Sequence, residues 1–201
     1  WLQEVARNSR RSYFHDQPWL LAEYFKHSAH LYQHNVHLKN GGYGNMVLSR
    51  WPFRTHHLVS LRMNQKKPSG AQLVTAKTPE GELHLVNWHL GLAETERRWQ
   101  VLHLLAHPLF RESSHLPTII AGDFNEGDGD AIAFLEERGF RNGLADFASS
   151  RETWRWQTSV GSVGAELDHM MYNSQLAPLF VRVLDAGRSD HLPILAAFVS
   201  R

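Results

Sequence analysis

The stretch Pro-Thr-Ile-Ile-Ala-Gly-Asp-Phe-Asn, residues 117–125, decides how this chain folds. Its first five residues form a largely apolar run that is typical of a buried strand, and a glycine, an acid and an amide follow. A second stretch has the opposite order, because Ser-Asp-His at 189–191 comes directly before the apolar run 192–199. Side chains at strand ends of an α/β fold can meet in one crevice. Two carboxylates, an amide and an imidazole in such a crevice indicate a divalent metal and a phosphoryl oxygen.

The composition limits the class of protein. The chain has 201 residues, enough for one domain, and its hydrophobic share of 42% can supply a core. The net charge of +1 gives no gross basic field of the kind that non-specific nucleic-acid binders show. Cysteine is absent, which excludes disulfides and thiolate chemistry and favours a reducing compartment, the cytoplasm. The longest apolar run, 192–199, is far below the roughly 20 residues that span a bilayer, so we expect no transmembrane segment.

Hydrophobic periodicity and turn residues predict the secondary structure. Strands are expected over 2–5, 45–50, 59–63, 71–77, 83–89, 118–121, 167–172, 179–184 and 193–199. Helices are expected over 94–107 and 131–138, the second capped by Asp-Gly-Asp at 128–130, whereas 18–25 fits either a helix or a loop. Because strands outnumber helices and short turns join many of them, we expect mixed, mainly antiparallel sheets with helices on the outer faces. The fold class is thus an α/β sandwich, in one domain over residues 1–201.

The acids and amides at the strand ends each allow two interpretations. Asp123 and Asn125 share a face of an extended chain and can together bind a metal and orient water, or they can simply form a turn. Asp190 beside His191 can ligate a metal while the imidazole moves a proton. The alternative is a turn cap next to a structural histidine.

Four more polar residues interrupt apolar segments. His89 ends the strand 83–89 and is either a site residue or a hydrogen-bonded core histidine. Asp168 enters an apolar strand, and a buried carboxylate needs a partner such as an imidazole. Glu4 has the same character, and Asn45 follows a glycine-rich turn. None of these four identifies a site by itself.

Thr-Trp-Arg-Trp at 153–156 interleaves aromatic rings with a cation, which can stack on bases or contact lipid headgroups. We expect structural packing of both tryptophans instead, and no obvious hydrophobic hairpin is visible in the sequence. The cations at 7, 10 and 11, near Glu4, and at 97 and 98, on the helix after His89, could attract phosphates. Exposed charges of this kind are usually only solvated surface, and we expect that here.

The order of these motifs is more specific than any one of them. The chain carries, in this order, Leu-Gln-Glu at 2–4, Gly-Asn-Met-Val-Leu-Ser-Arg at 44–50, Asn-Trp-His-Leu-Gly-Leu at 87–92 followed by Arg-Trp-Gln at 98–100, Gly-Asp-Phe-Asn at 122–125, Leu-Asp-His at 167–169 and Ser-Asp-His-Leu-Pro at 189–193. This set closely resembles the endonuclease/exonuclease/phosphatase superfamily, which has the deoxyribonuclease I-like fold.

The resemblance implies a four-layer α/β/β/α sandwich and phosphoester hydrolysis with Mg²⁺ or Mn²⁺. By position, Glu4 resembles the family's metal-binding glutamate and Asp190 a further acid of the metal site. Asp123 and Asn125 resemble the pair that orients water and phosphate beside the metal. The expected partner is a phosphoester substrate, and we expect a monomer.

The resemblance also implies catalytic roles. His191 resembles the family's catalytic histidine, Asp168 its carboxylate partner and His89 the second histidine of the nuclease and sphingomyelinase branches. Asn45 falls where those branches place an acid or amide near that second histidine. We assign the general base to His191, with Asp123 as the competing candidate, and expect Asn125 to position the nucleophile or a phosphoryl oxygen.

One departure concerns the start of the chain. The family normally begins with a strand that carries an asparagine, upstream of Leu-Gln-Glu, and 1–201 lacks it. We therefore expect an N-terminally incomplete domain. The leading interpretation is a metal-dependent phosphodiesterase of the nuclease type. The alternatives are a phospholipid (sphingomyelinase-like) or inositol-phosphate hydrolase, and a catalytically impaired phosphate-binding module.

Overall fold

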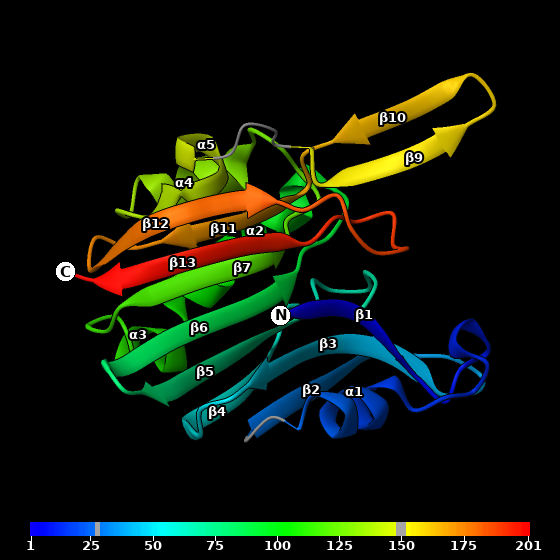
Figure 1. The fold of residues 1–201 in the computed structure, drawn as a ribbon, viewed down its shortest axis with the longest axis horizontal. Helices are drawn as coiled ribbons and strands as arrows, with labels where there is room; N and C mark the ends of the chain where they lie inside the picture. Colours follow the sequence, from blue (N-terminus) through cyan, green and yellow to red (C-terminus); the bar gives the residue numbers. More distant parts are fainter. Residues whose placement is uncertain (27–28, 148–151) are drawn as a thin grey trace.

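Six strands form the larger sheet of the computed structural model, which describes residues 1–26, 29–147 and 152–201 (Figure 1). Their order is β4 (Phe53–Ser60), β5 (Gly70–Thr78), β6 (Gly81–His89), β7 (Thr118–Asp123), β11 (Asp168–Tyr172) and β8 (Arg141–Asn142). Strands β6 and β7 run parallel, and the other neighbours are antiparallel. The sheet is therefore mixed and mainly antiparallel, as predicted.

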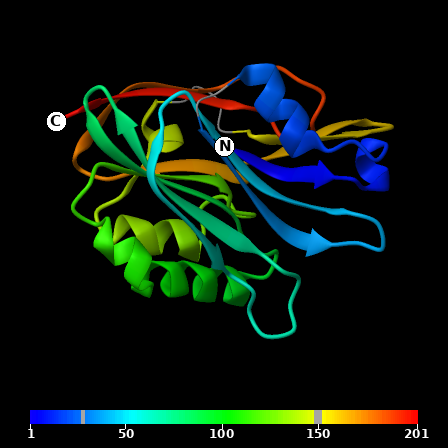
Figure 2. The same cartoon turned by 90° about the horizontal axis from the view of Figure 1, so that it is seen from below.

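A second layer of strands faces one side of this sheet (Figure 2). It comprises a three-stranded sheet in the order β1 (Leu2–Arg7), β3 (Gly42–Ser49), β2 (Ala29–His37), and the pair β12 (Leu176–Val183) and β13 (Ile194–Ser200). Successive side chains of a strand point to opposite faces. In β7, Ile119 and Ala121 accordingly pack toward this second layer, and Ile120 packs away from it.

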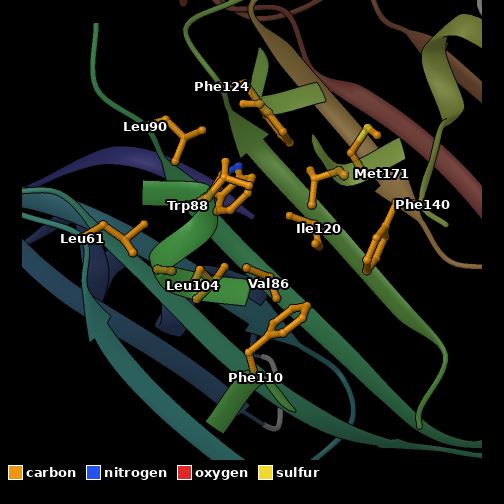
Figure 3. Packing of buried hydrophobic residues seen from close by; sticks show 14 of the residues in the cluster. Leu61, Val86, Trp88, Leu90, Leu104, Phe110, Ile120, Phe124, Phe140 and Met171 are labelled. Atoms are coloured by element: carbon orange, nitrogen blue, oxygen red, sulfur yellow. The ribbon is translucent and has the colours of Figure 1, made fainter. Parts of the chain in front are cut away.

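Helices cover the outer face of the larger sheet. Figure 3 shows this core, where Trp88 of β6 and Ile120 of β7 pack with Leu104 and Phe110. The helices are α2 (Glu94–Ala106), α3 (Pro108–Glu112) and α4 (Asp130–Glu136), while α5 (Gly143–Phe147) contacts β11 and β12. Helix α1 (Gln17–Phe25) lies on the opposite side of the molecule, beside β1 (Figure 2). The predicted four-layer α/β/β/α sandwich is confirmed.

Several predicted elements need correction. The strand expected over 59–63 is the end of β4, which begins at Phe53. β2 and the hairpin of β9 (Trp154–Thr158) and β10 (Gly161–Ala165) were not predicted, because their sequences lack a clean apolar alternation. The segment 18–25 is helical. No helix in the three described ranges is long and apolar enough to cross a membrane.

The start of α4 also differs from the prediction. Gly129 is its N-cap and offers no side-chain cap. The carboxylate of Glu126 caps the helix instead, because its Oε1 accepts from the backbone N–H of Ala131 at 2.7 Å and of Ile132 at 3.3 Å. Its Oε2 accepts from Arg97 Nε at 2.6 Å, so Arg97 is a partly buried ion-pair partner and not solvated surface. This pair fixes the loop that follows Asn125.

Candidate functional site

Strand register brings three polar residues to one edge of the larger sheet. His89 is the last residue of β6 and lies opposite Asp123, the last residue of the parallel strand β7. Asp168, the first residue of the antiparallel strand β11, lies opposite Asp123 on its other side. The ends of β6 and β7 and the start of β11 therefore meet at this edge, as the sequence predicts for strand-end side chains.

His191 reaches this edge from the loop before β13. Its Nδ1 lies 2.7 Å from Asp168 Oδ2, and a β-bridge to Trp154 holds its backbone. The hydrogen bond to Asp168 raises the pKa of His191 to about 9, because it outweighs the opposing effect of burial and is reinforced by the charge of Asp168. Asp168 thus orients His191 and stabilises its protonated form.

Asp123 lies between two imidazoles. Its Oδ2 is 3.3 Å from His89 Nε2 and 3.9 Å from His191 Nε2, and its Oδ1 accepts from the backbone N–H of Asn125 at 2.8 Å. Burial, followed by the charge of Asp168, raises the pKa of Asp123 to about 7. Burial lowers the pKa of His89 to about 4, so this imidazole is neutral at pH 7. At pH 7 the carboxyl group of Asp123 can therefore accept a proton, while the imidazole of His191 is protonated and can donate one.

The two amides of the predicted site are held by backbone carbonyls. Asn125 has a left-handed backbone (φ +53°), so it does not continue the strand face of Asp123 as the sequence suggested. Its Nδ2 donates to the carbonyl of Leu90 at 2.7 Å. Asn45, on β3, is buried, and its Nδ2 donates to the carbonyl of Gly70 at 3.0 Å. Both amide groups are thereby fixed in orientation.

Glu4 and Asp190 approach from other elements. Glu4, in the left-handed region of β1 (φ +53°), accepts from Arg11 Nη2 at 2.5 Å and lies 3.7 Å from Lys67 Nζ. Burial acts to raise the pKa of Glu4, but the hydrogen bond and charge of Arg11 lower it overall. Asp190 Oδ2 accepts from Trp154 Nε1 at 3.1 Å, at the exposed edge of the site.

A cleft of about 980 Å³ brings these residues together. Every residue predicted for the site from the sequence lines it: Glu4, Asn45, His89, Asp123, Asn125, Asp168, Asp190 and His191. They come from both β layers, so the cleft opens where the strand ends of the two layers meet.

The oxygen donors of the cleft suit a hydrated divalent cation. Within the described ranges, no three His, Asp or Glu residues are grouped closely enough to hold a metal ion between them. Mg²⁺, however, commonly uses one or two carboxylates and completes its shell with water and substrate phosphates. Burial and the neighbouring charge of Asp168 raise the pKa of Asp123, and Glu4 already attracts Arg11 and Lys67, so the carboxylates of the cleft favour a positive charge among them. The donor set therefore fits Mg²⁺ or Mn²⁺ shared with a substrate phosphate.

Sequence reasoning missed a buried residue that supports the site. The hydroxyl of Thr153 accepts from the backbone N–H groups of Leu167 and Asp168, each at 2.9 Å. Its carbonyl accepts from the N–H of Leu192 at 2.6 Å. Thr153 therefore links the strand that carries Asp168 to the loop that carries His191. The only sequence signal for this residue is its position directly before the Trp-Arg-Trp segment.

A second supporting group bonds the residue that precedes Glu4. Asn87, which shares the face of His89 on β6, accepts from Gln3 Nε2 at 2.7 Å and donates to Gln72 Oε1 at 2.7 Å. These amides link β1 to the larger sheet next to the cleft. The alternation in 83–89 placed Asn87 on this face, but its partners are far away in sequence.

Comparisons with known proteins agree with this geometry. The sequence profile of the endonuclease/exonuclease/phosphatase family matches residues 2–191. A family protein from Beutenbergia cavernae superposes with a TM-score of 0.81 at 18% identity, over 99% of this chain and 61% of that one. A Bacteroides vulgatus family protein gives 0.78 at 16% identity, over 99% and 83% of the two chains.

A mannosyl-6-phosphatase from Bacteroides thetaiotaomicron gives a TM-score of 0.69 at 15% identity, over 91% of this chain and 81% of that one. No curated protein matches the chain. The structural likenesses establish the fold, and the profile covers nearly the whole sequence. The chain therefore belongs to the endonuclease/exonuclease/phosphatase family, whose members hydrolyse phosphoesters.

Proposed function

We propose that the chain is a metal-dependent phosphodiesterase in which water attacks phosphorus in line with the leaving oxygen. One observation carries the proposal: Asp168, His191, Asp123 and His89 form a continuous chain of contacts inside a single cleft. Family membership supports phosphoester hydrolysis in general. That the substrate is a phosphodiester is part of our proposal.

The Asp123–His191 pair is suited to remove a proton from the attacking water. Asp168 fixes the His191 ring by its hydrogen bond to Nδ1, so that Nε2 faces Asp123. Either Asp123 accepts the proton while protonated His191 binds a phosphoryl oxygen, or His191 accepts it directly. The raised pKa of His191 supports the first assignment.

The remaining residues position the reacting groups. Neutral His89 has one ring N–H, which is suited to donate to a phosphoryl or leaving oxygen. The fixed amides of Asn125 and Asn45 limit where a phosphate can lie. Glu4, with Asp190 at the edge, would hold Mg²⁺ or Mn²⁺, and the ion, when bound, would neutralise charge on the phosphoryl oxygens.

A second candidate function is a phosphate-binding module without turnover. The ion pairs of Glu4 with Arg11 and Lys67 favour it, because two protein cations already occupy the carboxylate that a metal would need. A phosphate would then be held by Arg11 and Lys67 without activation. The Bacteroides mannosyl-6-phosphatase shows that proteins of this fold also include a phosphomonoesterase, so monoesters belong in the substrate panel.

Hydrolysis of bis-(p-nitrophenyl) phosphate, with and without Mg²⁺ or Mn²⁺, tests the proposal. We expect turnover that requires the metal and that His191→Ala abolishes. His30→Ala, an exposed histidine on β2, is the matched control. Metal-independent phosphate binding without turnover would favour the second candidate. A panel of DNA, RNA, sphingomyelin, inositol phosphates and sugar phosphates then assigns the substrate.

A further inference from the structure

The hairpin β9–β10 carries an apolar face that begins at the cleft. Cross-strand pairs set Trp156 opposite Val163 and Trp154 opposite Ala165 on this face. The two indole rings lie 6.4 Å apart and nearly parallel, at 10°. Trp156 is 56% exposed and Val163 57%, so the predicted structural packing of both tryptophans is wrong for Trp156. The hairpin projects from the body of the molecule in Figure 1.

The residues at the tip and on the opposite face of the hairpin indicate whether the apolar face binds a membrane or a nucleic acid. Val160, at the tip, is 95% exposed and has an aliphatic side chain, which gains little from stacking on a base. The only charged residue between 154 and 165 is Arg155. It is engaged by Glu152 and Asp185, so the hairpin presents no unpaired cation to a phosphate chain. These features suit the interfacial region of a membrane better than a nucleic acid.

A second apolar projection lies at the same end of the molecule. The turn after the 3₁₀ helix η1 (Arg10–Ser12) exposes Tyr13 at 86% and Phe14 at 57%. Both have left-handed backbones, φ +50° and +63°, held by the bond from the Phe14 N–H to the Ser9 carbonyl at 2.8 Å. A strained turn that exposes two adjacent aromatic residues indicates a role outside the fold. Both views show η1 and the hairpin tip at one end of the molecule (Figures 1 and 2).

Cations accompany these apolar projections. Lys66 lines the cleft, Arg10 lies in η1 and Arg188 lies in the loop before His191. Within the described ranges none of the three has a carboxylate partner. Exposed apolar tips with nearby cations are complementary to an anionic phospholipid surface, which offers an apolar interior beneath negative headgroups.

We propose that the chain docks on a phospholipid membrane through the hairpin β9–β10 and the Tyr13–Phe14 turn, so that the cleft faces the headgroup phosphoesters. This proposal rests on the proposed function for its substrate, a phosphoester of a lipid headgroup. The hairpin and the turn lie on two sides of the cleft, because Trp154 bonds Asp190 and Arg11 of η1 bonds Glu4. Docking by both would leave the cleft open to the lipid surface between them.

Sedimentation with vesicles tests the docking. We expect binding to vesicles of equal parts phosphatidylcholine and phosphatidylglycerol, and weaker binding to phosphatidylcholine alone. Trp156→Ser combined with Val160→Ser should weaken the binding at least about tenfold, the scale expected when two apolar side chains no longer leave water. Leu179→Ser is the matched control, because Leu179 on β12 is 63% exposed and lies outside the cleft. No binding by the wild type, or equal binding by the double variant, overturns the proposal.

Two further measurements separate the possible failures. Turnover of soluble bis-(p-nitrophenyl) phosphate reports on the cleft alone, and His191→Ala should lose this turnover while it still sediments with vesicles. Vesicle binding without any turnover would refute the proposed function and leave the docking intact. A fluorescent single-stranded oligonucleotide tests the other surface: if only its binding depends on Trp156 and Val160, the hairpin is a base-stacking platform and membrane docking is wrong.

Discussion

The imidazole of His191 is bound by the carboxylate of Asp168, Nδ1 to Oδ2 at 2.7 Å, across 23 residues of sequence. Asp168 is itself in register with Asp123, which lies 3.9 Å from the other ring nitrogen of His191. One carboxylate therefore orients the ring while a second faces its free nitrogen. This relationship predicts that the three residues act as a unit.

Removal of the Asp168–His191 bond should nearly abolish turnover. We expect Asp168→Asn and His191→Ala each to lower kcat by at least about 10²-fold, the scale of a lost general acid or base. The double variant should be little worse than either single variant, because residues of one unit are not additive. Steady-state kinetics on a soluble diester measures this. If the loss of kcat in the double variant equals the product of the two single losses, Asp168 and His191 act independently and the prediction is wrong.

The pH dependence should identify the general base. If ionised Asp123 is the base and protonated His191 the acid, kcat/KM rises as pH passes the Asp123 pKa of about 7 and falls beyond the His191 pKa of about 9. If neutral His191 is the base, the rate instead continues to rise through about 9. We expect the bell shape, and Asp123→Asn should remove its acidic limb. A rate that rises through the His191 pKa and then levels off without falling would assign the base to His191.

Glu4 should control the affinity for the metal. Glu4→Gln removes the charge that Arg11 and Lys67 now share, and we expect the Mg²⁺ concentration for half-maximal turnover to rise at least about tenfold. Glu82→Gln, which breaks the Arg54 ion pair at the surface, is the control. An unchanged metal requirement in Glu4→Gln would remove Glu4 from the metal site.

Thr153 should act as a positioning residue. Thr153→Val leaves the N–H groups of Leu167 and Asp168 without an acceptor, which should cost about 1–3 kcal/mol of unfolding free energy. Because Asp168 would shift with its strand, kcat should fall more than KM changes. Thr153→Ser keeps the hydroxyl and should restore kcat. Equal kcat in the Val and Ser variants would make the role purely structural.

His84 should make stability depend on pH. Burial lowers the pKa of His84 to about 4, and neither ring nitrogen has a hydrogen-bond partner within the described ranges. The unfolded chain, with a pKa near the ordinary value of about 6.5, binds the proton first. The unfolding free energy is therefore unaffected by His84 above about pH 6.5. It decreases as the pH falls from about 6.5 toward 4, by up to about 3 kcal/mol.

Chemical denaturation at several pH values measures the effect. The difference in unfolding free energy between neutral and acidic pH should shrink in His84→Leu. It should stay as in the wild type in His56→Gln, an exposed histidine on β4. An unaltered pH dependence in His84→Leu would show that this ring is not the cause.

The sequence by itself determined which groups stand at the strand ends. The apolar runs before Asp123 and after His191 identify buried strands, since alternation and hydrophobicity are local properties of the chain. The order of the motifs then indicated the family, and all eight predicted residues line the cleft. The same reliance on local pattern explains why β2 and the hairpin β9–β10 were not predicted and why the start of β4 was misplaced. Exposed polar residues in these strands interrupt the alternation of apolar and polar side chains that identifies a strand.

Only the tertiary structure decided how these groups act on one another. Strand register set Asp123 opposite both His89 and Asp168, and burial of this cluster shifted its pKa values. Contacts between separate segments of the chain likewise decide the pairing of Glu4 with Arg11, the hydrogen bonds of Thr153 and the exposure of Trp156. Desolvation and charge act over a few ångströms, and the linear sequence does not contain those distances.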